Sequence, residues 1–357
     1  MIGSYIKALI LLISILFDLS LLRDIIYSDR YNRDNLRKVD KDKRVLVIVP
    51  YKGIDRKMED NIIALKSQSY KNYDIVAVVD SKNDPALSYI RRYGLKYLIA
   101  KNKIEDTSGK VNALIYALKK YKSSRYYAFV IADSDVYPKK NWLESLVNSL
   151  ESKHISTTYP YFMPLRGFWS DVKHVWNFIG FSLMSSDKTR FGWGGSLAFP
   201  NLYIEELIDQ LYHKKSDDIT ITKFYKSKGM KINYIADISY VYISESFGSF
   251  IEWSIRQTVW TIYANRYIFY YGIIYYVIFE GIFIYSLYLL LIANPIGLLL
   301  LTPKILSILR AERITRISKI KTAYIMLFIN LIYIYDLLVA YNKKEIMWRG
   351  SIYKIKE

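Results

Sequence analysis

The sequence predicts an α/β domain attached to transmembrane helices on both sides. Short apolar runs alternate with segments of helical spacing between residues 40 and 265. This alternation is typical of a mostly parallel sheet covered by helices. Long apolar stretches with few charges lie before and after this region. Such stretches indicate membrane spans, so we expect an integral membrane protein.

Residues 1–27 are expected to form an N-terminal transmembrane anchor. Met1–Leu22 is mostly apolar, and basic residues are frequent from Arg23 to Arg44. A cleaved signal peptide would carry its charge in front and a small-residue site behind, and neither feature is convincing here. An anchor with a basic cytoplasmic flank fits this pattern better, and a buried soluble helix is the alternative.

The region 40–265 is expected to be one α/β domain. Its first half predicts four strands and three helices, at Val45–Pro50, Tyr73–Asp80, Lys96–Ala100 and Tyr126–Ala132, and at Lys57–Ser67, Pro85–Tyr93 and Lys110–Tyr121. In such sheets ligands bind beyond the carboxyl ends of the strands. Three of these ends carry suggestive residues, namely Pro50 to Gly53, Asp80, and Asp133-Ser134-Asp135.

Residues 266–341 are expected to form a C-terminal transmembrane region. From Tyr267 to Thr302 the only charged residue is Glu280. As one helix this stretch would be about 54 Å long, nearly twice the ~30 Å hydrocarbon core. Asn294-Pro295 interrupts it. One span with a short re-entrant piece and a tight hairpin both remain open.

Two basic segments leave the number of spans undecided. The segment 304–321 is expected to be a basic cytoplasmic loop, and 342–357 a basic cytoplasmic tail. Basic segments prefer the cytoplasmic side. The apolar stretch Thr322–Ala340 lies between them, however, and a single span there would put them on opposite sides.

Composition and charge exclude several classes of protein. The chain has 357 residues, a net charge of +18, three histidines and no cysteine. Disulfides, thiolate zinc sites and a Cys nucleophile are therefore excluded, and a His-based metal site or a Ser-His triad is not expected. Basic residues flank apolar stretches and form no single stripe, so we expect no nucleic-acid partner. Catalysis would have to use carboxylates and basic groups.

Three short segments carry the chemical signals. Asp133-Ser134-Asp135 could share a divalent cation and a substrate hydroxyl, although a solvated turn also explains such a pattern. Ser216-Asp217-Asp218 precedes a helical run, where acids favour the helix dipole and where one could also act as a general base. Phe191–Ser196 contains glycines that would allow a ligand to approach the backbone closely, or would simply form a tight turn.

Taken in order, these segments resemble family 2 glycosyltransferases of the GT-A fold, and more narrowly the ceramide glucosyltransferase-like branch. The resemblance covers nearly the whole chain. The matching segments are Lys52-Gly53-Ile54-Asp55 with Asn61, Asp80 with Asp84-Pro85-Ala86, Gly109-Lys110-Val111-Asn112, Asp133-Ser134-Asp135, Gly194-Gly195-Ser196 and Ser216-Asp217-Asp218. The implied fold is a Rossmann-like, mostly parallel GT-A domain over residues 40–265, with N-terminal and C-terminal transmembrane helices.

The resemblance implies an inverting, metal-dependent transfer from a nucleotide-diphospho sugar, with a UDP-sugar as the expected donor. The residues implied on the donor side are Pro50, Lys52, Asp80, Lys110 and Asp133. Asp135 would hold Mg²⁺ or Mn²⁺ on the diphosphate.

The implied catalytic group is the pair Asp217 and Asp218, with Asp218 as the base that takes the proton of the acceptor hydroxyl. Arg256 would stabilise the departing diphosphate, and Gln257 stands beside it.

The acceptor side departs from the family pattern. Arg256-Gln257-Thr258-Val259-Trp260 lacks the second Arg of the usual Q/R-x-x-R-W, and Trp253 to Gln257 is similar to a W-x-x-R-Q variant. The acceptor-side residues implied are Gly194, Gly195, Ser196, Trp253, Trp260, Trp348 and Arg349. Trp253, Trp260 and Trp348 could instead anchor the chain at the bilayer surface. The aromatic segment Phe168–Met184 would suit the membrane interface, or would pack against the sheet.

We therefore expect a membrane-bound enzyme that moves one hexose to the hydroxyl of a membrane lipid, with its catalytic domain on the cytoplasmic face. A processive polysaccharide synthase and a polyprenyl-phosphate sugar synthase are alternatives. A non-catalytic membrane scaffold is the alternative from a different class. A scaffold is disfavoured, because it would not explain why Asp133, Asp135 and Asp218 occur together in this order.

Overall fold

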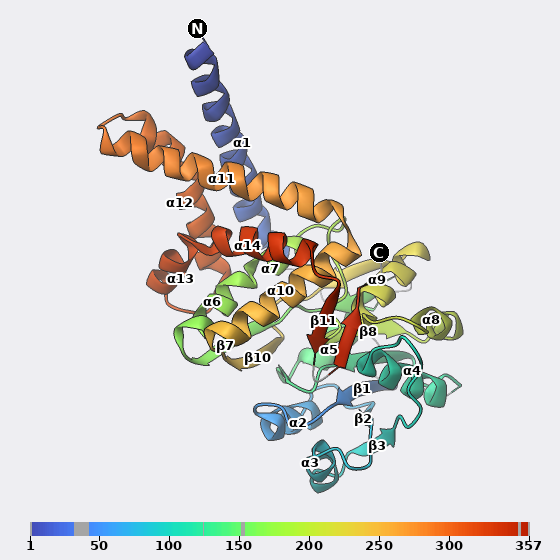
Figure 1. The fold of residues 1–357 in the computed structure, drawn as a ribbon. Coiled ribbons are helices and arrows are strands. Elements are labelled where there is room, and N and C mark those ends of the chain that lie inside the picture. Colours follow the sequence, from blue (N-terminus) through green and yellow to red (C-terminus); the bar gives the residue numbers. More distant parts are fainter. Residues whose placement is uncertain (1, 32–42, 124, 151–153, 349–350, 356–357) are drawn as a thin grey trace.

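The structure is a computed structural model that describes residues 2–31, 43–123, 125–150, 154–348 and 351–355. Its centre is a seven-stranded sheet in the order β3-β2-β1-β4-β8-β6-β9 (Figure 1). The strands are β1 (Val45–Tyr51), β2 (Tyr73–Val79), β3 (Lys96–Ile99), β4 (Ala128–Ala132), β6 (His154–Thr157), β8 (Ser196–Pro200) and β9 (Lys231–Tyr234). Only β8 runs antiparallel to its neighbours β4 and β6. The predicted α/β class and the first four strands are confirmed.

Strand β1 shows why this sheet forms. Its sequence VLVIVPY is apolar throughout, and Val45–Val49 is fully buried. Alternate side chains enter two separate clusters, with Leu46 and Ile48 on one face and Val47 and Val49 on the other. Burial on both faces is what a strand between two helical layers requires.

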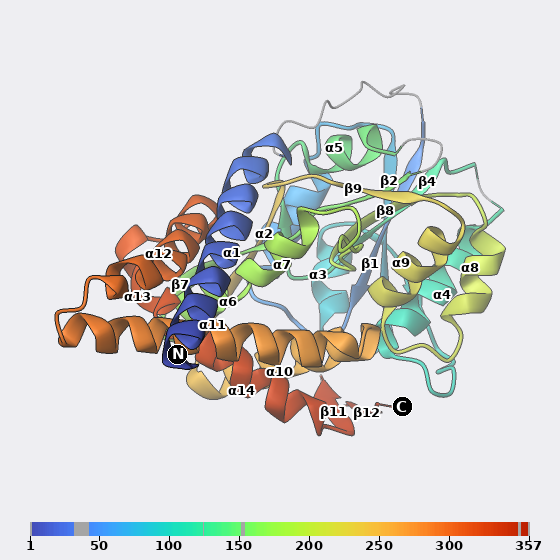
Figure 2. The ribbon, with the colours of Figure 1, turned by 90° about the horizontal axis from the view of Figure 1, so that it is seen from above.

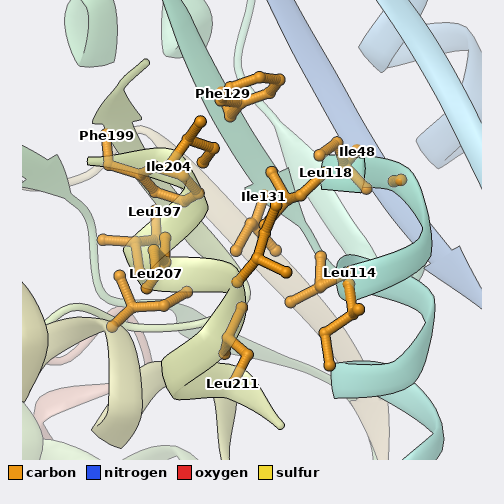
Figure 3. Packing of buried hydrophobic residues seen from close by; sticks show 14 of the residues in the cluster. Ile48, Leu114, Leu118, Phe129, Ile131, Leu197, Phe199, Ile204, Leu207 and Leu211 are labelled. Atoms are coloured by element: carbon orange, nitrogen blue, oxygen red, sulfur yellow. The ribbon is translucent and has the colours of Figure 1, made fainter. Parts of the chain in front are cut away.

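Helices cover both faces of the sheet. One layer consists of α4 (Gly109–Tyr121), α8 (Ile204–Leu211) and α9 (Asp217–Ser227), whose leucines and isoleucines pack on Phe129 and Ile131 (Figure 3). The opposite layer consists of α2 (Met58–Lys66), α3 (Ala86–Arg92) and α5 (Trp142–Asn148). The three helices predicted in the first half are α2, α3 and α4.

A second, three-stranded sheet leads from the main sheet toward the C-terminal helices. It contains β5 (Val136–Pro138), β10 (Ser239–Ser244) and β7 (Tyr161–Arg166) in the order β5-β10-β7. Three helices follow these strands, namely α6 (Phe168–Trp176), α7 (Phe178–Met184) and α10 (Phe247–Ala264). Side chains of α6 and α10 pack with those of α13 (Lys319–Met326) and α14 (Ile329–Tyr341) in one apolar cluster. The aromatic segment Phe168–Met184 is thus a packed element, with Phe168 itself exposed.

Three long helices lie to one side of the α/β domain (Figures 1 and 2). Helix α1 (Ile2–Tyr31) lies along α12 (Ile296–Ile314), and α12 returns antiparallel to α11 (Tyr267–Leu291). Within the described residues, Tyr5–Ile26 and Tyr267–Leu291 are long and apolar enough to cross a membrane. The α13–α14 pair, bent by 50°, would make a third such segment if it counts as one span.

The segment 304–321 is not the loop expected from its charges. Residues 304–314 continue α12, and α13 begins at Lys319. Lys304 is 2% exposed and forms an ion pair with Glu280 of α11, with 2.6 Å between Nζ and Oε1. Arg310 pairs with Asp24 of α1 at 3.0 Å. Carboxylates on neighbouring helices allow these cations to be buried. The basic charges therefore do not mark a loop, and most of the segment is helical.

Glu280 is the polar centre of the contact between helices α11, α12 and α14. Besides Lys304 it accepts a hydrogen bond of 2.6 Å from the Asn330 amide of α14. Replacing Glu280 with Leu would leave the Lys304 ammonium buried without its counter-charge. We expect a loss of about 3–5 kcal/mol in the free energy of unfolding, because one member of a buried ion pair is removed.

This loss is measured as a lower thermal midpoint in detergent micelles. The double variant Glu280→Leu/Lys304→Met removes both charges and is expected to recover most of the loss. The control is Ile284→Leu on the exposed face of α11. A single Glu280→Leu variant that melts like the wild type would contradict the assigned ion pair.

Candidate active site

The turn after β4 holds the first two acidic residues. The Asp133 amide donates to the Gly195 carbonyl at 3.1 Å, which joins this turn to the glycine segment before β8. The Ser134 hydroxyl donates to the Asp55 carboxylate, and its carbonyl accepts from the Asn61 side-chain amide at 3.1 Å. Contacts from both sides therefore fix the Asp133-Ser134-Asp135 turn at the carboxyl end of the strand.

Lys110 joins two acidic segments that are far apart in the sequence. Its Nζ lies 2.7 Å from Asp133 Oδ1 and 3.0 Å from Asp217 Oδ2. Burial alone would lower the pKa of Lys110, but Asp133 and Asp217 more than offset this and hold the pKa above its usual value. The structure thus brings together α4, the end of β4 and the start of α9 in one ion triad, Lys110–Asp133–Asp217.

The two neighbouring acids at the start of α9 lie in different environments. Asp217 is 6% exposed, and burial raises its pKa to about 6 despite the Lys110 ammonium. Asp218 is half-buried and accepts a 2.8 Å hydrogen bond from the Ile219 amide and another from the Ser216 hydroxyl. Ser216 also caps the helix. The cap and a chemical role coexist, and Asp218 is the acid of the pair that a substrate can reach more easily.

Gly194 allows the closest approach in the site. A Cβ atom there would lie 2.4 Å from Asp217 Oδ2 and 2.9 Å from Lys110 Nζ. The glycine segment is therefore more than a tight turn, because its backbone lies directly against the ion triad. Ser196, expected on the acceptor side, lies in β8 instead, fully buried, and its hydroxyl accepts from the Trp142 indole at 2.6 Å.

The substitution Gly194→Ala is expected to disturb the ion triad. The added methyl group has to displace a buried carboxylate or ammonium, and such overpacking costs about 1–3 kcal/mol of stability. We expect a lower thermal midpoint together with a loss of catalytic activity. Gly248→Ala is the matched control, because a Cβ there meets no atom within 4 Å. Wild-type activity in Gly194→Ala would show that the close approach of the Gly194 backbone to Asp217 and Lys110 is not needed for activity.

The other candidate donor residues lie at the ends of β1 and β2. Lys52 Nζ is 3.8 Å from Asp80 Oδ2, and both side chains are about 40% exposed. A Cβ on Gly109 would lie 3.6 Å from Asp80 Oδ2, so this carboxylate faces the start of α4 next to Lys110. Pro50 lies in β1 directly before this edge. These residues border the ion triad on the side of the first three strands.

Asp135 directly precedes β5, a strand of the second sheet. Lys173 Nζ of α6 donates a hydrogen bond to Glu245 Oε1 at 2.7 Å. Burial lowers the pKa of Lys173, Glu245 opposes this shift, and the charges of Asp135 and Arg256 make smaller contributions of opposite sign. The sequence interpretation did not single out Lys173 or Glu245 as candidate site residues. Lys173 lies near one that it did, because its Nζ is 4.3 Å from the Trp253 ring centroid.

The remaining candidates lie along α10 and the C-terminal hairpin. Trp253 packs edge-on against Trp176, with 4.9 Å between ring centroids. The Arg256 Cζ atom lies 5.9 Å from the Trp348 ring centroid. Trp348 belongs to β11 (Glu345–Trp348), which pairs with β12 (Ser351–Lys354) to form the C-terminal hairpin. Gln257 and Trp260 are half-buried on α10, and Trp260 packs toward the same hairpin. Arg349 lies outside the described residues.

The oxygen donors fit a hard divalent cation that arrives with its substrate. Among the described residues there is no group of three or more His, Asp or Glu that could hold a metal by itself. Asp133 and Asp135 supply two carboxylates on one turn. Mg²⁺ and Mn²⁺ are commonly bound by one or two carboxylates plus substrate phosphates, which is the arrangement this turn can offer.

The mostly parallel sheet, with the acidic turn and the glycine segment in contact at the end of β4, has the arrangement expected of a nucleotide-sugar glycosyltransferase. The chain belongs to Glycosyl transferase family 21, whose sequence model matches residues 7–357. Membership of this family agrees with the GT-A class predicted from the sequence. No curated protein matches the chain.

Three solved structures are similar at low identity. A mannosyltransferase from Pyrobaculum calidifontis, in complex with GDP-Man and Mn²⁺, is 15% identical, with 93% of this chain and 85% of that chain covered and a TM-score of 0.46. Glucosyl-3-phosphoglycerate synthase from Mycobacterium tuberculosis, in complex with Mn²⁺, UDP and glucosyl-3-phosphoglycerate, is 14% identical, with 58% of this chain and 74% of that chain covered and a TM-score of 0.39. TarS residues 1–349 from S. aureus is 15% identical over 60% and 65%, with a TM-score of 0.38.

Proposed function

We propose that this glycosyltransferase moves one hexose from a nucleotide-diphospho sugar to a hydroxyl group of a membrane lipid. The observation that carries the proposal is the contact between the site and the apolar C-terminal helices. Asp336 of α14 accepts hydrogen bonds from the Trp176 indole at 2.8 Å and from the Ser254 hydroxyl at 2.9 Å. Trp176 and Ser254 lie on α6 and α10, the helices that also carry Lys173 and Arg256.

We further propose that the catalytic domain lies on the cytoplasmic face. The α11–α12 hairpin returns the chain to the side from which α11 starts, which supports one common side for both basic segments. Lys215 Nζ donates to the Lys354 carbonyl at 2.5 Å, so the C-terminal hairpin contacts the catalytic domain directly. Segments rich in Lys and Arg prefer the cytoplasmic side.

The proposed roles follow the geometry of the site. Asp80 and Lys52 would contact the nucleoside, and Lys110 would hold Asp133 and Asp217 in place. Asp218 would accept the proton of the acceptor hydroxyl as that oxygen attacks the anomeric carbon.

On the opposite side of the site, Arg256 would face the diphosphate that leaves, as a planar cation with several donors. A Mg²⁺ or Mn²⁺ ion bound at Asp135 would supply charge neutralisation for this leaving group.

The proposal is tested with the purified full-length chain in lipid vesicles. The donors offered are UDP-hexoses and GDP-hexoses with Mn²⁺, and the products are analysed by mass spectrometry. We expect a membrane lipid extended by one hexose, with a UDP-sugar as the preferred donor. Long polymer would favour a processive synthase, and a sugar on a polyprenyl phosphate would favour the other alternative. Equal transfer to water-soluble acceptors without membrane would contradict the proposal.

A further inference from the structure

His174 is a buried histidine at the point where the catalytic domain meets the connection between α12 and α13. It lies on α6, which packs against both β7 and α13 (Figure 1). Its ring Nε2 accepts a hydrogen bond of 2.8 Å from the backbone amide of Arg316, in the connection 315–318. Its Nδ1 bonds the backbone carbonyl of Phe162 in β7. The imidazole therefore links three segments that are far apart in the sequence.

These two backbone partners fix the chemical state of the ring. A backbone amide can only donate a hydrogen bond, and a backbone carbonyl can only accept one. Nε2 of His174 must therefore be unprotonated, while Nδ1 carries the proton and donates it to the carbonyl. The ring is neutral in this arrangement. A second proton, on Nε2, would point at the Arg316 amide hydrogen and break that contact.

The environment of the ring favours the neutral form. Burial is the largest effect and lowers the pKa of His174, although the β7 carbonyl and the Asp171 charge oppose the shift. The positive charge of Arg316 lowers this pKa further. Both charged neighbours have partners of their own. Asp171 Oδ2 lies 2.8 Å from Lys321 Nζ of α13, and the Arg316 guanidinium lies 3.2 Å from Asp237 Oδ2, just before β10.

Charged and titratable groups on the other elements packed against α6 also have partners. Lys173 pairs with Glu245 at 2.7 Å, and Asp336 of α14 accepts hydrogen bonds from side chains of α6 and α10. The Tyr161 ring of β7 lies 5.1 Å from the Arg316 guanidinium. A carboxylate could bond the imidazole only by replacing one of its two backbone partners. In this arrangement a protonated ring would therefore lose a hydrogen bond without gaining a counter-charge.

We infer that His174, through its bonds to Arg316 and Phe162, is a pH-sensitive latch that holds the α12–α13 connection on the catalytic domain. The second sheet continues this link, since β7 pairs with β10 and β10 pairs with β5, the strand directly after Asp135. The inference depends on neither the donor nor the acceptor of the proposed reaction.

The direction of the pH dependence follows from the lowered pKa of His174. An exposed histidine has a pKa of about 6.5, so the latch is at full strength above this pH. As the pH falls from there toward the lowered pKa, the open form binds one more proton than the latched form. The equilibrium should then shift toward the open form by up to about tenfold per pH unit.

The test follows hydrogen exchange of the segment 315–318 by mass spectrometry, in the full-length chain in detergent micelles. Rates are corrected for intrinsic exchange from about pH 7.5 to about pH 5, the range in which histidine titrates. Wild-type protection should fall by up to about tenfold per pH unit. His174→Gln does not titrate, and its amide oxygen can accept from the Arg316 amide, so its protection should not change with pH. His213→Gln, at an exposed histidine, is the matched control and should behave like the wild type.

His174→Phe keeps a ring of similar size but cannot accept a hydrogen bond, so its protection should be low at every pH. Exchange is the deciding measurement because burial raises the pKa of Asp217 to about 6, and activity therefore changes in the same pH range. Wild-type protection that does not depend on pH would overturn the inference. A pH-dependent fall in His174→Gln or His174→Phe as large as that of the wild type would overturn it as well.

Discussion

Replacing Asp218 with Asn is expected to lower kcat by about 10²–10⁴-fold, the usual effect of losing a positioned general base. Asn has nearly the same shape as Asp, and its side-chain oxygen can still accept the hydrogen bond from the Ile219 amide. Helix α9 should therefore still begin at the same place. The neutral amide cannot take up the proton of the acceptor hydroxyl. Only the rate of the transfer step should therefore fall.

The measurement is kcat together with donor affinity from calorimetry, and donor affinity should barely change. Asp217→Asn provides the contrast within the same pair. It removes one carboxylate from Lys110 and should lower stability and donor affinity along with activity. Normal transfer by Asp218→Asn with complete loss in Asp217→Asn would show that the base is the other carboxylate.

Replacing Asp135 with Ala is expected to abolish sugar transfer. The turn would lose one of its two carboxylates for a divalent cation, and the diphosphate would lose the charge that the cation brings. Binding of UDP in Mn²⁺, measured by calorimetry, should fall toward the value for wild type in excess chelator. Asp209→Ala, an exposed acid on α8, is the control. Full activity of Asp135→Ala, or of wild type without divalent metal, would remove the metal assignment.

Strands β1 and β4 could be predicted because each is a continuous apolar run, buried on both faces. The signal is weaker in β2, which contains Asp74, and in β3, which is partly exposed at the edge of the sheet. The later strands β6 and β9 lack such a run. Strand β6 reads His154-Ile155-Ser156-Thr157, and it is held by pairing with β8 and β9 from distant parts of the chain. Such pairing depends on the tertiary structure, so no local pattern reveals it.

The acidic turn and the acidic pair could be located from the sequence, but the contact that unites them could not. Lys110 and Asp217 are 107 residues apart, and only the folded sheet brings them within 3.0 Å. The basic segment 304–321 was mispredicted as a loop for the same reason. Its charges are visible in the sequence, whereas the carboxylates that partner them, Glu280 and Asp24, lie on other helices.

On the membrane topology proposed above, the Glu280–Lys304 pair would also constrain how the chain enters the bilayer during synthesis. Glu280 leaves the ribosome 24 residues before Lys304. A charged residue that enters the hydrocarbon alone costs about 3 kcal/mol on insertion scales. The cost falls when the partner charge arrives alongside. Helices α11 and α12 are therefore expected to enter the membrane together as a preformed hairpin, and α11 should wait at the insertion machinery until α12 has emerged.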